Sequence, residues 1–348
     1  MNSRASVREV YFAPLILCGA MLVCAFIAGE LADVSWRYLF IPYFSTALAI
    51  TFVSLLLSIF WWVLQLARLR ADAPLGAVKE KLRERAVYLL LPGVILPLFL
   101  VSFTVAKTAI PLLVGYSWDP LFARADRLIF GDDAWRIAYH WLGTGAERPL
   151  EWFYCVAWGI GLFFVMALVP LNSSPKFTGK FYTAMLAIWL VGGFVLAYVF
   201  SSAGPVFAHL VNSDAGDQFA GLRAVLKANL TPQGPIQGTQ VYLASALHTH
   251  IAVKGGGISA MPSMHIAAPS ICVLAARRTR WLIPAILFWI IIFVGSAYFG
   301  YHYWVDGLAA ALLAVLAWAF AEKMSEKSAI SLTNPFTRLR PGRVVGEA

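Results

Sequence analysis

The sequence predicts an all-α protein that crosses a membrane several times. Hydrophobic residues make up 60% of the 348 residues and charged residues only 13%, whereas about a quarter of a soluble protein is charged. Several apolar runs reach the roughly 20 residues that a helix needs to cross a bilayer. Composition therefore favours a polytopic helical bundle over the two soluble domains that the length alone suggests.

Eight apolar segments are predicted to be transmembrane helices. The first, from Val10 to Ala28, is longer than the apolar core of a signal peptide, about 7–15 residues, and is taken as a retained span. We predict two N-terminal helices with a basic cytoplasmic loop at 1–86, a larger membrane domain at 87–321 and a polar cytoplasmic tail at 322–348. The eight spans lie at 10–29, 39–66, 87–113, 150–169, 181–201, 263–276, 281–300 and 302–321.

The positions of the basic residues predict the orientation. If the N-terminus is cytoplasmic, most of the 27 Lys and Arg residues lie on the cytoplasmic side, including the run from Lys79 to Arg85. The positive-inside rule then places both termini inside. It also explains the net charge of +9 without a nucleic-acid partner. The run at 79–85 is predicted to be a solvated helix that touches anionic headgroups.

Two long segments fall on the outer side. Residues 114–149 alternate apolar and charged residues at helical spacing, which is typical of helices that lie along the membrane interface. Residues 202–262 are polar and glycine-rich, and they are too many for a passive connection. In this outer segment His248 and His250 form an HxH pair, but without a third ligand nearby we predict no metal there.

His302 and Asp306 are the strongest candidates for chemistry. They lie four residues apart at the start of the last span, so both side chains project from one face of its first turn. A carboxylate at that spacing can hold an imidazole in one tautomer and stabilise its cationic form, as a nucleophile or general base requires. The alternative is a helix N-terminus that simply favours Asp.

His265 is expected on the same side of the membrane, at the start of the sixth span. Pro262 suits the first turn of that helix, and Ser259 or Ser263 can cap it. Helix N-termini attract phosphate through free amides and the helix dipole. We therefore predict a phosphate site with His302 as the nucleophile and His265 as the acid that protonates the leaving oxygen, and Asp306 orients the nucleophile.

The phosphate itself needs further ligands. The three glycines from 255 to 257 let the backbone approach an anion closely. Lys107 is a charged residue inside a span, which by default indicates a function, although a lysine near a span end can also extend to the headgroups. The candidate phosphate ligands are Lys107, Ser263, Gly256 and Gly257.

Two short motifs resemble known signatures. Pro262-Ser263-Met264-His265 resembles the second signature of the type-2 phosphatidic acid phosphatase superfamily, and His302-x3-Asp306 resembles its third. The wider stretches at 255–265 and 300–307 look like the branch that includes inositol phosphorylceramide synthases and their bacterial relatives. Ser202-Ala203-Gly204-Pro205 is similar to that branch as well. The resemblance covers about 100–320.

The resemblance implies a six-helix catalytic core and a phosphohistidine formed on His302. It also implies that His265 protonates the departing alkoxide and that neither metal nor other cofactor is needed. This sequence departs from the family at two places. Ser296 stands where the third signature usually has an arginine. The first signature has a lysine seven residues before an Arg-Pro pair. This sequence has the pair, Arg148-Pro149, but Trp141 stands at the lysine position. Lys107 is then the best candidate for binding phosphate.

The function that the resemblance implies is an integral-membrane lipid phosphotransferase that resembles inositol phosphorylceramide synthase. Its substrate would be a lipid phosphate or a phospholipid, and its site would face the periplasm of a bacterial inner membrane or a lumen. A lipid phosphate phosphatase of the same superfamily is the first alternative. A transporter or lipid-binding protein is the second, but it would place polar residues at mid-membrane in broken spans.

Overall fold

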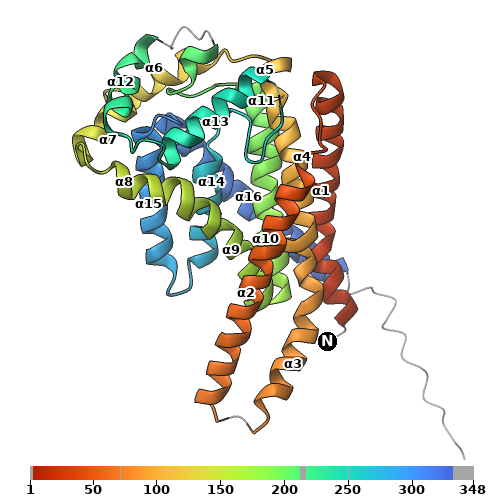
Figure 1. The fold of residues 1–348 in the computed structure, drawn as a ribbon. Helices are drawn as coiled ribbons and strands as arrows, with labels where there is room; N and C mark the ends of the chain where they lie inside the picture. The colour runs from red at the N-terminus through yellow and green to blue at the C-terminus, as the bar shows by residue number, and fades with distance from the viewer. Residues whose placement is uncertain (1–2, 71, 212–216, 250, 332–348) are drawn as a thin grey trace, which may run out of the picture.

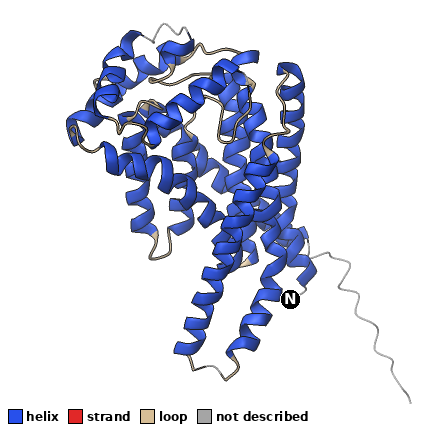
Figure 2. Cartoon of the chain, in the orientation of Figure 1, coloured by secondary structure: helices blue, strands red, loops and turns tan. Residues whose placement is uncertain are grey.

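The described part of the chain is a bundle of helices with a layer of shorter helices at one end (Figure 1). The computed structural model describes residues 3–70, 72–211, 217–249 and 251–331. Over these ranges all regular structure is helical, and Figure 2 shows no strand in them. The predicted all-α polytopic bundle is confirmed.

Six helical segments of the described residues are long and apolar enough to cross a membrane. Several are built from more than one helix in direct succession. Their helices are α1 (Ser3–Ala32), α2 (Phe40–Arg68), α3 (Pro74–Ala86) with α4 (Leu96–Thr108) and α5 (Ile110–Leu113), α8 (Glu147–Glu151) with α9 (Trp158–Asn172), α10 (Pro175–Leu190) with α11 (Ala197–Val199), and α16 (Trp304–Ser331).

The other two predicted spans are shorter helices. α14 (Met264–Ala276) has 13 residues and α15 (Leu282–Tyr298) has 17. They pack against each other as a hairpin, and α14 also packs against α16 and α10. The chain therefore has a helix at each of the eight predicted spans, but in these two the helix is shorter than a full crossing needs.

Wide π-helical turns interrupt three of the long segments, at Leu91–Ile95, Trp152–Ala157 and Val191–Leu196. Such turns are rare and are frequent at functional sites. The third turn contains Gly192 and Gly193, and a Cβ on Gly192 would lie 2.7 Å from Met264 Cε. These glycines therefore let α14 approach the α10 segment closely, at the turn where α14 begins.

The centre of the bundle is formed by α10, α14 and α16. Most of α10 between Thr178 and Ile188 is buried, and it packs against both α1 and α16. By contrast, α1 and α2 carry exposed apolar side chains such as Leu31 and Ile41. Exposed apolar residues on long apolar helices are expected where a helix faces lipid.

The layer at one end of the bundle consists of α6 (Asp119–Phe130), α7 (Ala134–Leu142), α12 (Ala220–Asn229) and α13 (Pro235–Thr249). Both long outer segments therefore contain helices. α6 is amphipathic, because Leu128 and Ile129 are exposed while Asp119 and Asp126 are buried. The opposite end carries the N-terminus and the protruding ends of α2 and α3 (Figure 1).

Three details differ from or extend the sequence prediction. α14 begins at Met264 with Ser263 in the cap position, so the prediction that Pro262 lies in its first turn is wrong. The basic run at 79–85 belongs to α3, which has no buried residue. α16 continues to Ser331, into the segment predicted as a polar tail; residues 332–348 lie outside the described ranges.

Candidate active site

His302 lies in the turn between α15 and α16, and its ring is held in one orientation. Its Nδ1 is 2.9 Å from the main-chain oxygen of Ala260. A carbonyl can only accept, so Nδ1 carries the hydrogen and Nε2 keeps its lone pair. The side chain is nearly buried, with 5% exposed. Nε2 is therefore the atom of His302 that can attack an electrophile.

Asp306 lies beside His302 as the spacing predicted, but it is not the nearest partner. Asp306 Oδ2 is 3.5 Å from His302 Nδ1, and it accepts a hydrogen bond of 3.0 Å from the Tyr303 amide. Its other oxygen, Oδ1, is buried without a hydrogen-bond partner among the described residues. The Ala260 carbonyl and the Asp306 carboxylate together fix the imidazole from the Nδ1 side.

His265, in the first turn of α14, faces the opposite nitrogen. His265 Nδ1 is 3.4 Å from His302 Nε2. Two aromatic rings lie against its imidazole: Tyr154 at 4.7 Å between ring centroids and Trp158 at 4.3 Å. The structure thus brings the two predicted histidines together. The lone pair of His302 Nε2 faces the His265 ring.

Burial decides the charge of His302. It lowers the pKa of His302 to about 3; the Ala260 carbonyl opposes this, and the nearby Lys107 ammonium adds to it. Near neutral pH the imidazole is therefore uncharged. An uncharged imidazole with its Nδ1 hydrogen engaged is the form that a nucleophile requires.

Lys107 lies under the glycine loop at 255–257 rather than at the protein surface. A Cβ on Gly257, whose φ is +82°, would be 2.8 Å from Lys107 Cγ, so the loop crosses directly over this side chain. The Lys107 ammonium is also 6.0 Å from the centre of the Phe103 ring. Lys107 is only partly exposed and lies close enough to act on His302 electrostatically.

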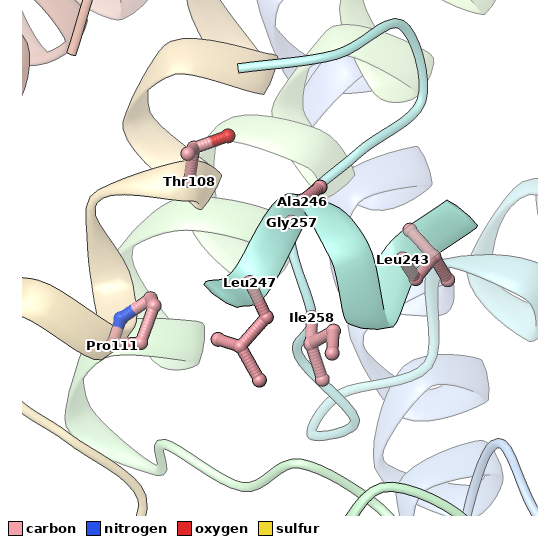
Figure 3. A pocket seen from close by; sticks show the side chains of 7 residues that line it. All are labelled: Thr108, Pro111, Leu243, Ala246, Leu247, Gly257 and Ile258. Atoms are coloured by element: carbon pink, nitrogen blue, oxygen red, sulfur yellow. The ribbon is translucent and has the colours of Figure 1, made fainter. Parts of the chain in front are cut away.

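A small apolar pocket adjoins this loop at Gly257 and Ile258 (Figure 3). It lies between the end of α4, α13 and the loop. It has room for at most about one water molecule, and none of the predicted catalytic residues lines it. Its lining residues are Thr108, Pro111, Leu243, Ala246, Leu247, Gly257 and Ile258.

The remaining predicted phosphate ligands differ in their surroundings. Ser263 is fully buried, and its Oγ has no hydrogen-bond partner in the described part of the chain. It does not cap α14 with its side chain. The Gly256 amide, in contrast, donates to the Val253 carbonyl at 2.7 Å within the turn. Ser263 is therefore available to a ligand, whereas the Gly256 amide is already engaged.

The loop before α14 is anchored by Ser202. The Ser202 carbonyl accepts a hydrogen bond of 2.8 Å from the Ala260 amide, and its hydroxyl accepts from the Met261 amide at 3.2 Å. The Ser263 amide donates to the Asp306 carbonyl at 3.2 Å. The carbonyl of Ala260 is thereby held at the place where it meets His302.

Asp119 of α6 fastens the segment that follows Ser202. Its carboxylate accepts from the amides of Ala203 and Gly204, at 2.9 and 2.8 Å, and from the Tyr303 hydroxyl at 3.0 Å. Gly204 has a φ of +88°, and a Cβ there would lie 2.4 Å from the Tyr301 carbonyl oxygen. The Asp119 carboxylate therefore connects three segments around His302. Its hydrogen bonds go to these segments and not to a headgroup.

Asp126, also in α6, caps α16. It accepts from the Trp304 amide at 3.0 Å and from the Val305 amide at 2.9 Å. These are the free amides at the start of α16 that were expected to attract phosphate. Because the Asp126 carboxylate already occupies the N-terminus of α16, only the N-terminus of α14 remains to attract a phosphate.

Burial raises the pKa of Asp126 to about 7, against the effect of its two amide partners. The unfolded value is about 3.9. Because the folded protein holds the proton more tightly, the stability that Asp126 contributes is greatest below about pH 4 and is lost as the pH rises towards 7. Near neutral pH the side chain exchanges between its charged and neutral forms.

Removing the Asp126 side chain is expected to destabilise the protein. In Asp126→Ala the two buried amides lose their acceptor, which costs about 2–4 kcal/mol of unfolding free energy. Asp126→Asn keeps one acceptor and should cost less, and it should abolish the Asp126 share of the decline in stability between pH 4 and 7. Thermal unfolding in detergent across that pH range measures both. Equal stability of the alanine variant and the wild type would contradict this capping role.

Ser296, which departs from the third signature, and Arg148, which matches part of the first, have clear surroundings. Ser296 is buried, and its carbonyl accepts from the Tyr301 amide at 3.0 Å and from the His302 amide at 3.3 Å. It shapes the turn that carries His302 but supplies no charge.

The side chain of Arg148 is exposed. Of the HxH pair, His250 lies outside the described residues.

Several residues of the site were not predicted. They are the carbonyl of Ala260 and the rings of Tyr154 and Trp158. For Asp126 the sequence left open whether it caps a loop or binds a headgroup. For Trp158 there was a signal in the sequence. Pro269 lies four residues after His265 and has no amide hydrogen, so the His265 carbonyl has no partner within its own helix. The indole Nε1 of Trp158 donates to it at 3.1 Å.

Comparison with known proteins identifies a family for this chain. The family model described as the PAP2 superfamily matches residues 123–320, from α6 to α16. That range contains His265, His302 and Asp306 and begins after Lys107. No curated protein and no solved structure matches the chain.

Proposed function

The chain belongs to the PAP2 superfamily, and from this premise we propose that it is a lipid phosphotransferase that works through a phosphohistidine on His302. Membership supports a phosphatase-type lipid enzyme embedded in a membrane. The observation that carries the proposal is the pair of histidines: His302 Nε2 has a free lone pair and lies 3.4 Å from His265 Nδ1. One ring can attack phosphorus while the other handles the proton of the leaving oxygen.

In the first half-reaction His302 Nε2 attacks the phosphorus of the donor lipid. The new N–P bond forms as the bond from phosphorus to the leaving oxygen breaks, and His265 gives that oxygen a proton. In the second half an acceptor hydroxyl attacks the phosphohistidine and returns a proton to His265, and the N–P bond breaks. Each histidine ends in the state in which it began.

Charge on the phosphoryl oxygens needs stabilisation in both steps. Lys107 supplies a positive charge close to His302, and the unpartnered hydroxyl of Ser263 can donate to a phosphoryl oxygen. The N-terminus of α14 adds its dipole. Groups fixed before the reaction in a site shielded from water stabilise developing charge more than mobile water does. Lys107 takes the place of the arginine that Ser296 replaces.

The orientation proposed for the site is the outer face of a bacterial inner membrane. It is supported by the basic turn between α14 and α15, with Arg277, Arg278 and Arg280, which lies at the far end of α14 from His265. Basic turns favour the cytoplasmic side. The histidines would then lie at headgroup depth on the periplasmic side.

Product analysis separates a transferase from a hydrolase. Purified protein in liposomes is incubated with a panel of phospholipids and lipid phosphates, with and without ceramide-type and inositol-type acceptors, and the products are identified by mass spectrometry. The proposal predicts an acceptor that carries the transferred group, formed at least about tenfold faster than free phosphate or phosphorylated headgroup, since water is kept from the buried site. Release to water alone would identify a lipid phosphate phosphatase, and no product from any lipid would contradict both.

A further inference from the structure

His265 has to carry a positive charge before it protonates the leaving oxygen, yet no carboxylate of the described residues forms an ion pair with it. The ion pairs found within the described ranges include His302 with Asp306 but none with His265. Its ring makes a polar contact with His302 Nε2, at 3.4 Å. A buried charge without a partner is costly. Neighbouring groups that favour the imidazolium therefore bear directly on the acid role.

Two aromatic rings lie against His265. The Tyr154 ring is almost parallel to the imidazole, with 9° between the planes and 4.7 Å between the centroids. The Trp158 ring is at 4.3 Å and 33°. The face of an aromatic ring carries negative potential and attracts a cation, most strongly in tryptophan. A charged His265 is thus favoured by two ring faces at contact distance.

The rest of the molecule holds these rings in place. Trp158 is fixed by its hydrogen bond to the His265 carbonyl, which exists because Pro269 leaves that carbonyl without a partner in α14. Tyr154 also stacks on Tyr301, with 5.5 Å between the ring centroids. It lies in the wide turn at Trp152–Ala157, four residues before Trp158, so both rings point to the same side of this segment.

We propose that Tyr154 and Trp158 are positioning residues that form an aromatic clamp on His265, holding its ring and stabilising its charged form. This inference rests on the acid role of His265 in the proposed function. The clamp residues act through His265 and not on the substrate. Their contribution should appear only when the leaving oxygen needs a proton.

The test compares two substrates that differ in this need. Dihexanoyl phosphatidic acid has a poor alkoxide leaving group, whereas the leaving group of p-nitrophenyl phosphate departs without protonation. Trp158→Leu and Tyr154→Leu remove a ring face and keep a smaller apolar side chain. Each should lower kcat on phosphatidic acid about tenfold and change kcat on p-nitrophenyl phosphate less than about twofold.

The matched controls keep the ring and remove the polar atom. Trp158→Phe loses the indole hydrogen bond, and Tyr154→Phe loses the hydroxyl, which has no partner within the described structure. Both should retain at least about half the wild-type kcat on each substrate. If the phenylalanine variants lose as much as the leucine variants, the ring faces are not responsible. If the leucine variants lose both substrates equally, their role is structural and the clamp is overturned.

His265→Ala, measured beside them, separates failure of the clamp from failure of the proposed function. A loss confined to phosphatidic acid supports the acid role. If that selective loss appears in His265→Ala but in neither leucine variant, only the clamp is wrong. If His265→Ala loses both substrates equally, the acid role fails and the clamp fails with it. Having two clamp positions preserves the test if one leucine variant does not fold, as size-exclusion chromatography would reveal.

Discussion

His302→Ala is expected to lose turnover by at least about three orders of magnitude while the protein remains folded. The reason is that Nε2 of this ring forms the covalent bond in the proposed mechanism. His302 Nδ1 also bonds the Ala260 carbonyl at 2.9 Å, so alanine removes a structural contact together with the nucleophile. The measurement is initial rate in liposomes, with thermal unfolding on the same preparation.

A second variant separates these two effects. His302→Gln keeps a side chain of similar length whose amide can donate to the Ala260 carbonyl, yet it has no nucleophilic ring nitrogen. Its stability should lie closer to the wild type than that of the alanine variant, and its turnover should be equally low. Near-normal turnover in a folded His302→Gln protein would eliminate His302 as the nucleophile.

The second largest effect is expected at Lys107. Lys107→Met removes the positive charge next to the histidines while keeping a long apolar side chain under Gly257. Losing one fixed electrostatic stabiliser of this kind costs about 10²–10³ in kcat. The same variant should bind vanadate, a phosphate mimic, correspondingly less tightly. Inhibition by vanadate therefore reports on the site independently of turnover.

Lys254 provides a matched control on the same loop. Its ammonium group bonds the Thr46 hydroxyl of α2 and is not among the groups that act on His302. Lys254→Met removes the same charge from the same region, so a general effect of charge on the outer face would appear equally in both variants. Little change in Lys254→Met with a large loss in Lys107→Met supports a phosphate ligand. Equal losses would count against it.

Most of the fold could be predicted because membrane spans are local in the sequence. An apolar run of sufficient length identifies a helix wherever it packs, and each of the eight predicted spans contains one in the structure. The span at 263–276 agrees with α14 to within one residue, whereas the span at 281–300 is longer than α15, which has 17 residues. Their ends are set by the cap position at Ser263 and the turn after Tyr298, which hydrophobicity does not record.

The catalytic site was predictable only in part. The spacing of His302 and Asp306 is local, and the structure brings the two side chains together. The contact of His302 with Ala260 and the capping of α16 by Asp126 join segments far apart in the chain. No periodicity encodes such pairs. They arise because buried amides and ring nitrogens must find partners, and only the packed structure shows which partner is within reach.

A phosphohistidine on His302 can be detected by chemical trapping during turnover. Wild-type protein is mixed with a donor lipid labelled with ³²P in the transferred group, quenched within milliseconds in alkali, digested and analysed by mass spectrometry. The peptide that contains His302 is expected to carry the label. The label should be lost in acid and stable in base, as an N–P bond requires. No label is expected in His302→Gln. Label on another residue, or turnover without any labelled protein, would contradict a phosphohistidine on His302.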